Sequence, residues 1–281
     1  MATYYINADT GNDTTGDGSS SNPWLTISHA KDNVVDNDTI ICQNATATYL
    51  FEKLTIANTI TIQGQSLSAV VFSTTSDVLE GWKVDSGKTL TLKTITFSDC
   101  AVNTSESYSY LFTGDMVVEQ CIFMRINITT GGLSWGTGIF NRIYSNFSTY
   151  VFNGCLFYDI YDRGIILRFS QNGLETNITF NNCTFDLQEN QTILCGQSDP
   201  PTSIKNCIIY NNTGGSTAIS TYTNQLGSNT TFDYNCVYGV FSNPITGTGN
   251  LLDTDPIFID AATNNYNLSP SSPCIDAGTL I

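Results

Sequence analysis

The 281-residue chain has a single histidine, His29, and no two of its nine cysteines are separated by only two residues. Zinc sites use histidine and closely spaced cysteine, so the sequence disfavours a zinc centre. Basic residues are also scarce, because 10 Lys and Arg stand against 25 Asp and Glu and the formal net charge is −15. Such a chain lacks the basic face that nucleic acids require. It also disfavours a long anionic polysaccharide as its partner.

Long apolar runs are missing as well. No stretch of 18 apolar residues occurs, so we expect no transmembrane helix and no membrane insertion. The first residues contain neither a basic n-region nor an apolar h-region, so we expect no signal peptide here. Charged residues make up only 12% of the chain, and much of its polar remainder is Asn, Thr, Ser and Gly. These residues suit turns and solvated strand faces.

A short phrase recurs along the chain: a strand-forming segment, a polar corner, and a cysteine that opens a second strand. It is clearest at 178–185, ITFNNCTF. The equivalent cysteines are Cys121, Cys155, Cys183, Cys207 and Cys236, spaced by 34, 28, 24 and 29 residues. A constant phrase with a variable period indicates one solenoid coil per repeat, with loops of variable length between constant corners. Each unit is too small to bury its own apolar face and must stack on its neighbours.

These five cysteines are interpreted as a structural column. Equivalent residues of stacked parallel strands lie about 4.8 Å apart with side chains pointing the same way. A disulfide instead needs converging Cβ atoms about 3.8 Å apart. We therefore expect buried, reduced thiols that act as small apolar side chains, which implies folding in a reducing cytoplasm. A zinc or disulfide array is the alternative.

The residues that precede the cysteines form a second predicted ladder. Asparagine occupies this place at Asn182, Asn206 and Asn235. Asparagine tolerates the left-handed backbone conformation that a tight corner needs, and stacked amides can hydrogen-bond along the solenoid.

The chain divides into three predicted parts. Residues 1–37 form an N-terminal cap with a strand at 4–6, a polar loop and a helix over 24–35, whose apolar side covers the open end of the stack. Residues 38–245 form the coils. Residues 246–281 form an irregular C-terminal cap, since four of the seven prolines lie from Pro244 onward and proline ends strand ladders.

The two ends carry a family resemblance. The segment from Tyr4 to Ala30 (YYIN…GND…GDG…NPWLTISHA) resembles the N-terminal cap of right-handed parallel β-helix proteins of the pectate-lyase-like superfamily. The ending DPIF…YNL…SPCIDAG resembles their C-terminal phrase. The resemblance implies an all-β fold, a right-handed single-stranded parallel β-helix. That superfamily includes lyases, hydrolases, adhesins and virus spike or decorating proteins, so the fold does not name an activity.

Candidate chemistry gathers after Cys155. Asp159, Asp162 and Arg163 follow the cysteine strand, flanked by Tyr158 and Tyr161. Two carboxylates serve glycoside hydrolysis, in which one protonates the leaving oxygen while the other activates water or attacks. Tyrosine rings suit stacking on sugars. The alternative is that these are solvated loop residues with an Asp–Arg ion pair.

The following coil extends this candidate site. Asp186 and Glu189 come at a similar offset after Cys183, so the two carboxylate groups are expected to share a face. A lyase uses Lys or Arg as its base, by resemblance to the superfamily's lyases. Arg168 follows the first group, but no basic residue occupies the equivalent offset in the next coil, which disfavours a lyase.

The N-terminal loop gives a weak calcium alternative. Asp9, Asp13 and Asp17 lie at short spacing with glycines, as in oxygen-rich Ca²⁺ loops. The loop lacks an EF-hand's closing Glu, and hydrogen-bonded Asx turns are the favoured interpretation. We otherwise expect no cofactor.

The leading functional hypothesis is non-catalytic. Reduced cysteines, the missing export signal and the modest candidate site together favour a virion-surface component of a phage, either capsid-decorating or a fibre or spike. Its partners would be other virion proteins, a cell-surface glycan, or itself as a homotrimer, which the resemblance implies. The alternatives are a polysaccharide lyase or glycoside hydrolase that acts on a surface glycan, and a secreted or cell-surface adhesin.

Overall fold

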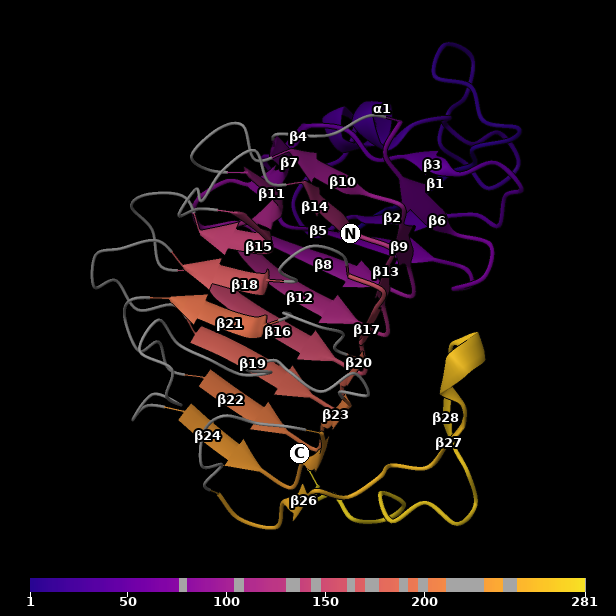
Figure 1. Cartoon of the computed structure of the whole chain (residues 1–281). Helices are drawn as coiled ribbons and strands as arrows, with labels where there is room; N and C mark the ends of the chain where they lie inside the picture. The colour runs from indigo at the N-terminus through magenta and orange to yellow at the C-terminus, as the bar shows by residue number, and fades with distance from the viewer. Residues whose placement is uncertain are drawn as a thin grey trace.

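The computed structural model describes residues 1–75, 80–103, 109–129, 137–142, 148–160, 165–169, 177–186, 192–196, 202–210, 230–239 and 247–280. Successive coils stack along one axis, and each passes through three parallel sheets in turn (Figure 1). The predicted all-β parallel β-helix is confirmed. Among the described residues, no helix is long and apolar enough to cross a membrane.

The first sheet has nine strands, and each pairs in parallel with the equivalent strand of the neighbouring coil. Its strands are β1 (Thr3–Ile6), β2 (Thr39–Cys42), β5 (Ile60–Gly64), β8 (Thr89–Lys93), β12 (Asp115–Glu119), β16 (Thr149–Asn153), β19 (Asn177–Asn181), β22 (Thr202–Lys205) and β24 (Thr230–Asp233).

The second sheet also has nine parallel strands, most of them only three residues long. They are β3 (Tyr49–Leu50), β6 (Val71–Ser73), β9 (Thr96–Ser98), β13 (Ile122–Met124), β17 (Leu156–Tyr158), β20 (Thr184–Asp186), β23 (Ile208–Tyr210), β25 (Cys236–Tyr238) and β26 (Leu251–Leu252).

The third sheet completes the coils with six parallel strands. These are β4 (Leu54–Ile56), β7 (Glu80–Val84), β11 (Ser109–Thr113), β15 (Thr137–Arg142), β18 (Ile165–Phe169) and β21 (Thr192–Gly196). A parallel pair, β10 (Ala101–Asn103) and β14 (Asn127–Thr129), lies between the second and third sheets along the chain.

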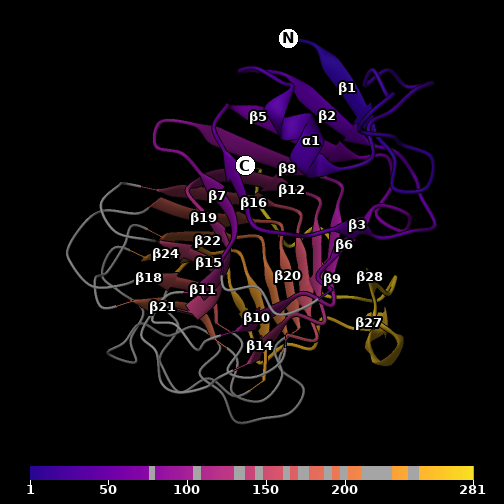
Figure 2. The same ribbon diagram turned by 90° about the horizontal axis from the view of Figure 1, so that it is seen from above.

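The core lies inside the ring of sheets (Figure 2). The middle residue of each short second-sheet strand points inward, and the inner row is Phe72, Phe97, Phe123, Phe157, Phe185, Ile209 and Val237, all fully buried. Neighbouring rings stack nearly parallel: the Phe123 and Phe157 centroids are 4.9 Å apart at 8°. In-register pairing therefore converts one phenylalanine per coil into a continuous aromatic stack.

The corner between the first and second sheets needs one residue with positive φ. That place is taken by Thr94, Gln120, Gly154, Asn182, Asn206 and Tyr234, whose φ angles are between 53° and 63°. The next residue points inward. Asn182 and Asn206 thus occupy the predicted corner, where asparagine tolerates a left-handed backbone.

The inward residue is cysteine in four successive coils: Cys121, Cys155, Cys183 and Cys207, each at most 2% exposed. Their thiols are free. Each of the last three has a backbone carbonyl of the preceding coil as a thiol acceptor; the Cys183 sulfur, for example, lies 3.6 Å from the Phe152 oxygen. Burial raises the pKa of Cys121, Cys155 and Cys183, so these thiols stay protonated.

Placing Cys236 and Asn235 in these two ladders was wrong. Lys205 pairs with Asp233, so Tyr234 forms the corner and Asn235 takes the inward place of the cysteine. The Asn235 side-chain nitrogen donates to the carbonyl of Ile204 at 2.9 Å, just as the thiols donate to equivalent carbonyls. Cys236 falls one residue later, in register with Ile208.

The N-terminal end is closed by α1 (Ile27–Asp32), which is shorter than the predicted 24–35 helix. The Thr26 hydroxyl caps it by accepting from the His29 backbone N–H at 3.1 Å. Ile27 and Ala30 are buried, whereas Leu25 precedes the helix and is 39% exposed. His29 lies edge-on to Trp24, with ring centroids 5.4 Å apart.

The C-terminal segment, residues 253–280, leaves the last coil and turns back along the outside of the second sheet (Figures 1 and 2). It contains an antiparallel hairpin of β27 (Phe258–Asp260) and β28 (Asn265–Leu268), joined through the short 3-10 helix η1 (Ala261–Thr263). Asn206 holds the end of this segment, because its side-chain amide donates to the Thr279 carbonyl at 2.7 Å and accepts from the Thr279 N–H at 2.9 Å.

Candidate functional site

The outer row of the second sheet carries the polar and aromatic groups. In each strand the residue after the inward one points outward, and register aligns Ser98, Met124, Tyr158, Asp186, Tyr210 and Tyr238. The hairpin β27–β28 lies over its C-terminal half. The Phe258 ring meets Tyr210 edge-on with centroids 5.4 Å apart. This row and the adjoining corner contain the described residues of the predicted site.

Asp186 is the buried carboxyl of the row, with only 8% of its surface exposed. Its Oδ2 accepts a 2.6 Å hydrogen bond from the Tyr266 hydroxyl of β28. Burial raises the pKa of Asp186, the Tyr266 hydrogen bond partly opposes that rise, and the charge of Asp159 adds to it. Asp186 therefore holds a proton more readily than an ordinary aspartate.

Tyr158 supports the hairpin rather than presenting a free ring. It is 7% exposed, and its ring lies 5.3 Å from that of Tyr266. Its hydroxyl donates to the Met124 sulfur at 2.6 Å, and burial raises its pKa. Tyr158 thus packs against Tyr266, and its sugar-binding role stays a prediction.

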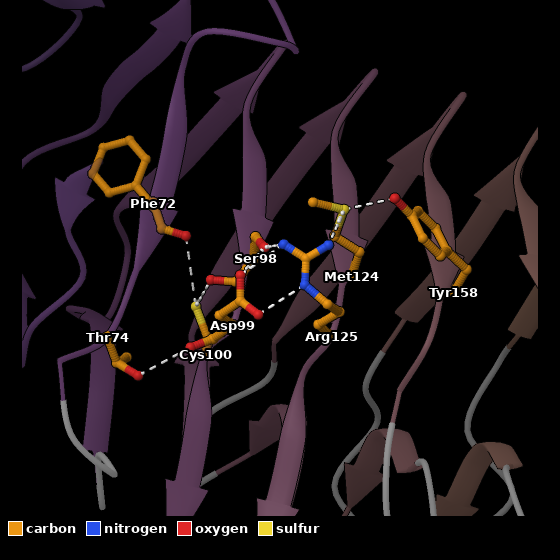
Figure 3. Close-up of polar contacts among 8 residues, drawn as sticks. All are labelled: Phe72, Thr74, Ser98, Asp99, Cys100, Met124, Arg125 and Tyr158. Atoms are coloured by element: carbon orange, nitrogen blue, oxygen red, sulfur yellow. Dashed lines mark hydrogen bonds and ion pairs between the residues drawn. The ribbon is translucent and has the colours of Figure 1, made fainter. Parts of the chain in front are cut away.

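Charged residues stand at the next corner, directly after the outer row. Asp99, Arg125 and Asp159 adopt positive φ there in three successive coils. Arg125 donates from Nε and an Nη nitrogen to the two carboxylate oxygens of Asp99, each at 2.7 Å, and to Ser98 Oγ (Figure 3). This paired arrangement raises the pKa of Arg125 and lowers that of Asp99.

Sequence reasoning missed Arg125, although a signal for it exists. Arg125 follows Cys121 by four residues, as Asp159 follows Cys155, so both fall at the same corner. Counting four residues from Cys121 and Cys155 finds Arg125 and Asp159, and the same count from Ile95, which takes the inward place one coil earlier, finds Asp99.

Of the predicted site residues, the structure brings Asp159 and Asp186 near enough for the charge of one to affect the other. Tyr161, Asp162, Arg163 and Glu189 lie outside the described residues. Arg168 belongs to β18 of the third sheet, where it pairs with Asn141 and Cys195.

The carboxylates of the calcium alternative are directed to separate backbone groups. Asp9 accepts from the N–H groups of Thr46 and Ala47, and Asp13 from those of Leu25 and Thr26. Asp17 accepts from the Ser19 N–H at 2.8 Å. Through these hydrogen bonds, Asp9, Asp13 and Asp17 stabilise the conformation of the N-terminal loop. Within the described ranges, no group of three or more potential ligand residues could hold a metal ion.

Several solved structures resemble this architecture. The pectin methylesterase of Aspergillus niger aligns with a TM-score of 0.50 and 14% identity over 96% of this chain and 90% of its own. The chain has a parallel β-helix fold like that of this esterase. A rhamnogalacturonan lyase matches this β-helix with a TM-score of 0.47 and 12% identity, covering 97% of this chain and 96% of that one. A pectate lyase gives 0.42 and 17%, covering 100% and 92%.

These structural neighbours are carbohydrate-active enzymes. No protein-family model matches the sequence of this β-helix, and no curated protein is significantly similar to it. At these identities the likeness establishes the fold, so any activity has to be argued from the residues themselves.

Proposed function

We propose that this protein is a glycoside hydrolase that acts on a neutral polysaccharide at the second sheet, around Asp159 and Asp186. The observation that carries the proposal is the buried Asp186 carboxyl, whose pKa is raised beside a second carboxylate. Glycoside hydrolysis needs one carboxyl that holds a proton and one that is ionised, and different surroundings produce that difference.

The two carboxyls take different roles. Asp186, with its raised pKa, donates a proton to the glycosidic oxygen. Asp159, at the corner that follows Tyr158, is the carboxylate that activates water or attacks the sugar. Tyr266 orients Asp186 through its hydroxyl, and Tyr158 supports the Tyr266 ring. The C-terminal hairpin thereby becomes part of the site.

A hydrolase fits the described residues better than a lyase. A lyase needs a basic side chain that gives up its proton to act as a base. Among the described residues, Arg125 is a cation beside this face, but its hydrogen bonds to Asp99 raise its pKa and keep it charged. Arg125 is therefore suited to holding the corner rather than to removing a proton.

The likeness to a pectin methylesterase supports a carbohydrate as the substrate class. The net charge of −15 favours a neutral glycan over an anionic one, because an acidic protein repels a polyanion.

The test is an assay of reducing ends released from a panel of neutral and anionic polysaccharides. We expect the unaltered protein to cleave a neutral member, and Asp186→Asn and Asp159→Asn each to lose about 10²–10⁴-fold in rate. Asp253→Asn is the matched control, since Asp253 is exposed, lies in the C-terminal segment and also has positive φ.

Three results would contradict the proposal. One is full activity of Asp186→Asn in a variant that unfolds at the same temperature as the unaltered protein. Another is release of an unsaturated sugar, which would identify a lyase. Absence of cleavage across the whole panel would also overturn it.

The virion-surface role, its protein partners and its homotrimer stay predictions from the sequence, as does folding in the cytoplasm. Neither the fold nor the structural neighbours support the virion role.

A further inference from the structure

Two cysteines stand apart from the buried column. Cys236 lies in β25 of the last complete coil, on the outward side of the second sheet, and Cys274 lies in the C-terminal segment that covers that side. Both carry free thiols. Their residues are 38 apart in sequence, but the two side chains interact directly, since each thiol shifts the pKa of the other.

Independent contacts bring the two residues together. The Cys236 sulfur also lies 3.3 Å from the carbonyl oxygen of Thr254, at the start of the C-terminal segment. Ser272 links the two ends of the C-terminal segment near this point. Its hydroxyl donates to the Pro256 carbonyl and accepts from the Cys274 N–H at 3.1 Å. The segment therefore forms a closed loop that holds Cys274 against the last coil.

We propose that Cys236 and Cys274 form a disulfide bond that fastens the C-terminal segment to the last coil when the protein meets an oxidising pool of small disulfides. The column cysteines differ in direction. Cys155, Cys183 and Cys207 also interact along the column, but they point the same way from stacked strands instead of converging from two segments. Sulfur atoms that converge from two different segments can be joined, whereas a parallel column keeps its thiols side by side.

The reaction balances as a thiol–disulfide exchange with oxidised glutathione. The Cys274 thiolate attacks one glutathione sulfur, which forms a mixed disulfide and releases one reduced glutathione. Cys236 then loses its proton and attacks the Cys274 sulfur, which releases the second. Two protein thiols are oxidised while one small disulfide is reduced to two thiols.

The surroundings favour Cys274 as the first nucleophile. The hydrogen bond from Cys236 lowers the pKa of Cys274 and raises that of Cys236. Cys274 is also partly exposed, whereas Cys121, Cys155, Cys183 and Cys207 are buried. The thiolate is the reactive form, so oxidation should begin at Cys274 and leave the column untouched.

The test treats the native protein with oxidised glutathione, removes the reagent and counts thiols after unfolding. We expect seven thiols per chain where the reduced chain has nine. Digestion with a protease that cleaves before aspartate separates the two cysteines into peptides 233–252 and 260–275, since Asp253, Asp255 and Asp260 lie between them. Mass spectrometry should find these two peptides joined, and separated again by a reductant.

Cys274→Ser should keep eight thiols after the same treatment. Cys236→Ser should stop at the mixed disulfide of Cys274 with glutathione and keep seven, and neither variant should yield the joined peptides. The matched control is Cys207→Ser, in the buried column, which should fall from eight thiols to six and retain the joined peptides. The folded state of each variant is checked by its unfolding temperature, and the oxidised unaltered protein should unfold at a higher temperature than the reduced one.

Nine thiols after treatment of the native protein would overturn the proposal. So would a link from either cysteine to peptide 199–232, which contains Cys207. None of these outcomes depends on glycan cleavage, so the disulfide and the proposed hydrolase stand or fall separately.

Discussion

The two faces of the second sheet differ sharply although the same three-residue strands build both. The inner row repeats nearly one residue type, and five of its seven members are phenylalanine. The outer row changes at nearly every coil, from serine through methionine and tyrosine to aspartate. Stacking in register rewards identical side chains inside, where each ring meets the ring of the next coil. On the outer face, each side chain contacts a different group, as Tyr158 contacts Met124 and Asp186 contacts Tyr266.

The largest expected effect comes from breaking the inner row. Phe157→Ala should lower the free energy of unfolding by about 3–5 kcal/mol, because it removes a buried ring stacked on both sides by Phe123 and Phe185. Leu156→Ala, one residue earlier and half-buried on the opposite face, should cost only about 1 kcal/mol. Denaturant unfolding of both variants measures the contrast. Equal losses would mean that the two faces contribute alike.

A smaller effect is expected from the outer row's contact with the hairpin. Tyr266→Phe keeps the ring but deletes the hydroxyl that donates to Asp186, so stability should fall by roughly 1–3 kcal/mol. The same change should raise the Asp186 pKa further, because that hydrogen bond favours the ionised form. Nuclear magnetic resonance titration of the Asp186 carboxyl carbon reads this directly. A pKa that falls in the variant would refute the assignment.

The attachment of the C-terminal segment can be weakened without straining the corner. Asn206→Gly preserves the positive φ of residue 206 but removes both hydrogen bonds to Thr279, so it should cost about 1 kcal/mol. Limited proteolysis should cut the C-terminal segment faster in this variant. Asn182→Gly, at the same corner one coil earlier, is the control and should leave the cutting rate unchanged.

The smallest effects distinguish two carboxyls by the sign of their pH dependence. The pKa of Asp186 is raised in the folded state, so its contribution to stability is present at low pH and is lost as pH rises through the folded pKa. Asp99 has a lowered pKa, so its contribution is present above its ordinary pKa and is lost as pH falls.

Stability measured against pH in two variants checks this difference. The stability of Asp186→Asn relative to the unaltered protein should increase as pH rises from about 4, the ordinary pKa of aspartate. Asp99→Asn should lose stability relative to the unaltered protein as pH rises toward about 4 from below, by less than about 1 kcal/mol because its ion pair with Arg125 is largely exposed. Curves of the same sign for the two variants would contradict the assigned surroundings.

The fold was predictable because the repeated phrase is local. A strand, a corner and an inward cysteine recur within eight residues, and any chain with that repeat has to stack. The error at Cys236 came from aligning on the cysteine itself. In the four true members, the cysteine follows an inward apolar residue of the first sheet by three positions, as Cys207 follows Ile204, whereas Phe232 is followed at that distance by Asn235.

The candidate site was only half predictable. Asp159 and Asp186 follow column cysteines of neighbouring coils by four and three residues, so regular stacking of the coils predicts that they lie near each other. Tyr266 could not be found, since it lies 80 residues from Asp186 and reaches it only through the docking of the hairpin. No repeat encodes that docking. It depends on the particular side chains of Tyr158, Tyr210 and Phe258.

The single-residue corner between the first and second sheets has a consequence for how this molecule can grow. Six coils, from Thr94 to Tyr234, return to that corner with the same backbone geometry, whatever the length of their loops. A duplicate of residues 155–182 would begin after one positive-φ corner, Gly154, and end at another, Asn182. Such an insertion adds one rung to the ladder and leaves both caps with their original partners. The length of this solenoid is therefore set by the number of coils that the gene encodes, and recombination can change that number in a single step.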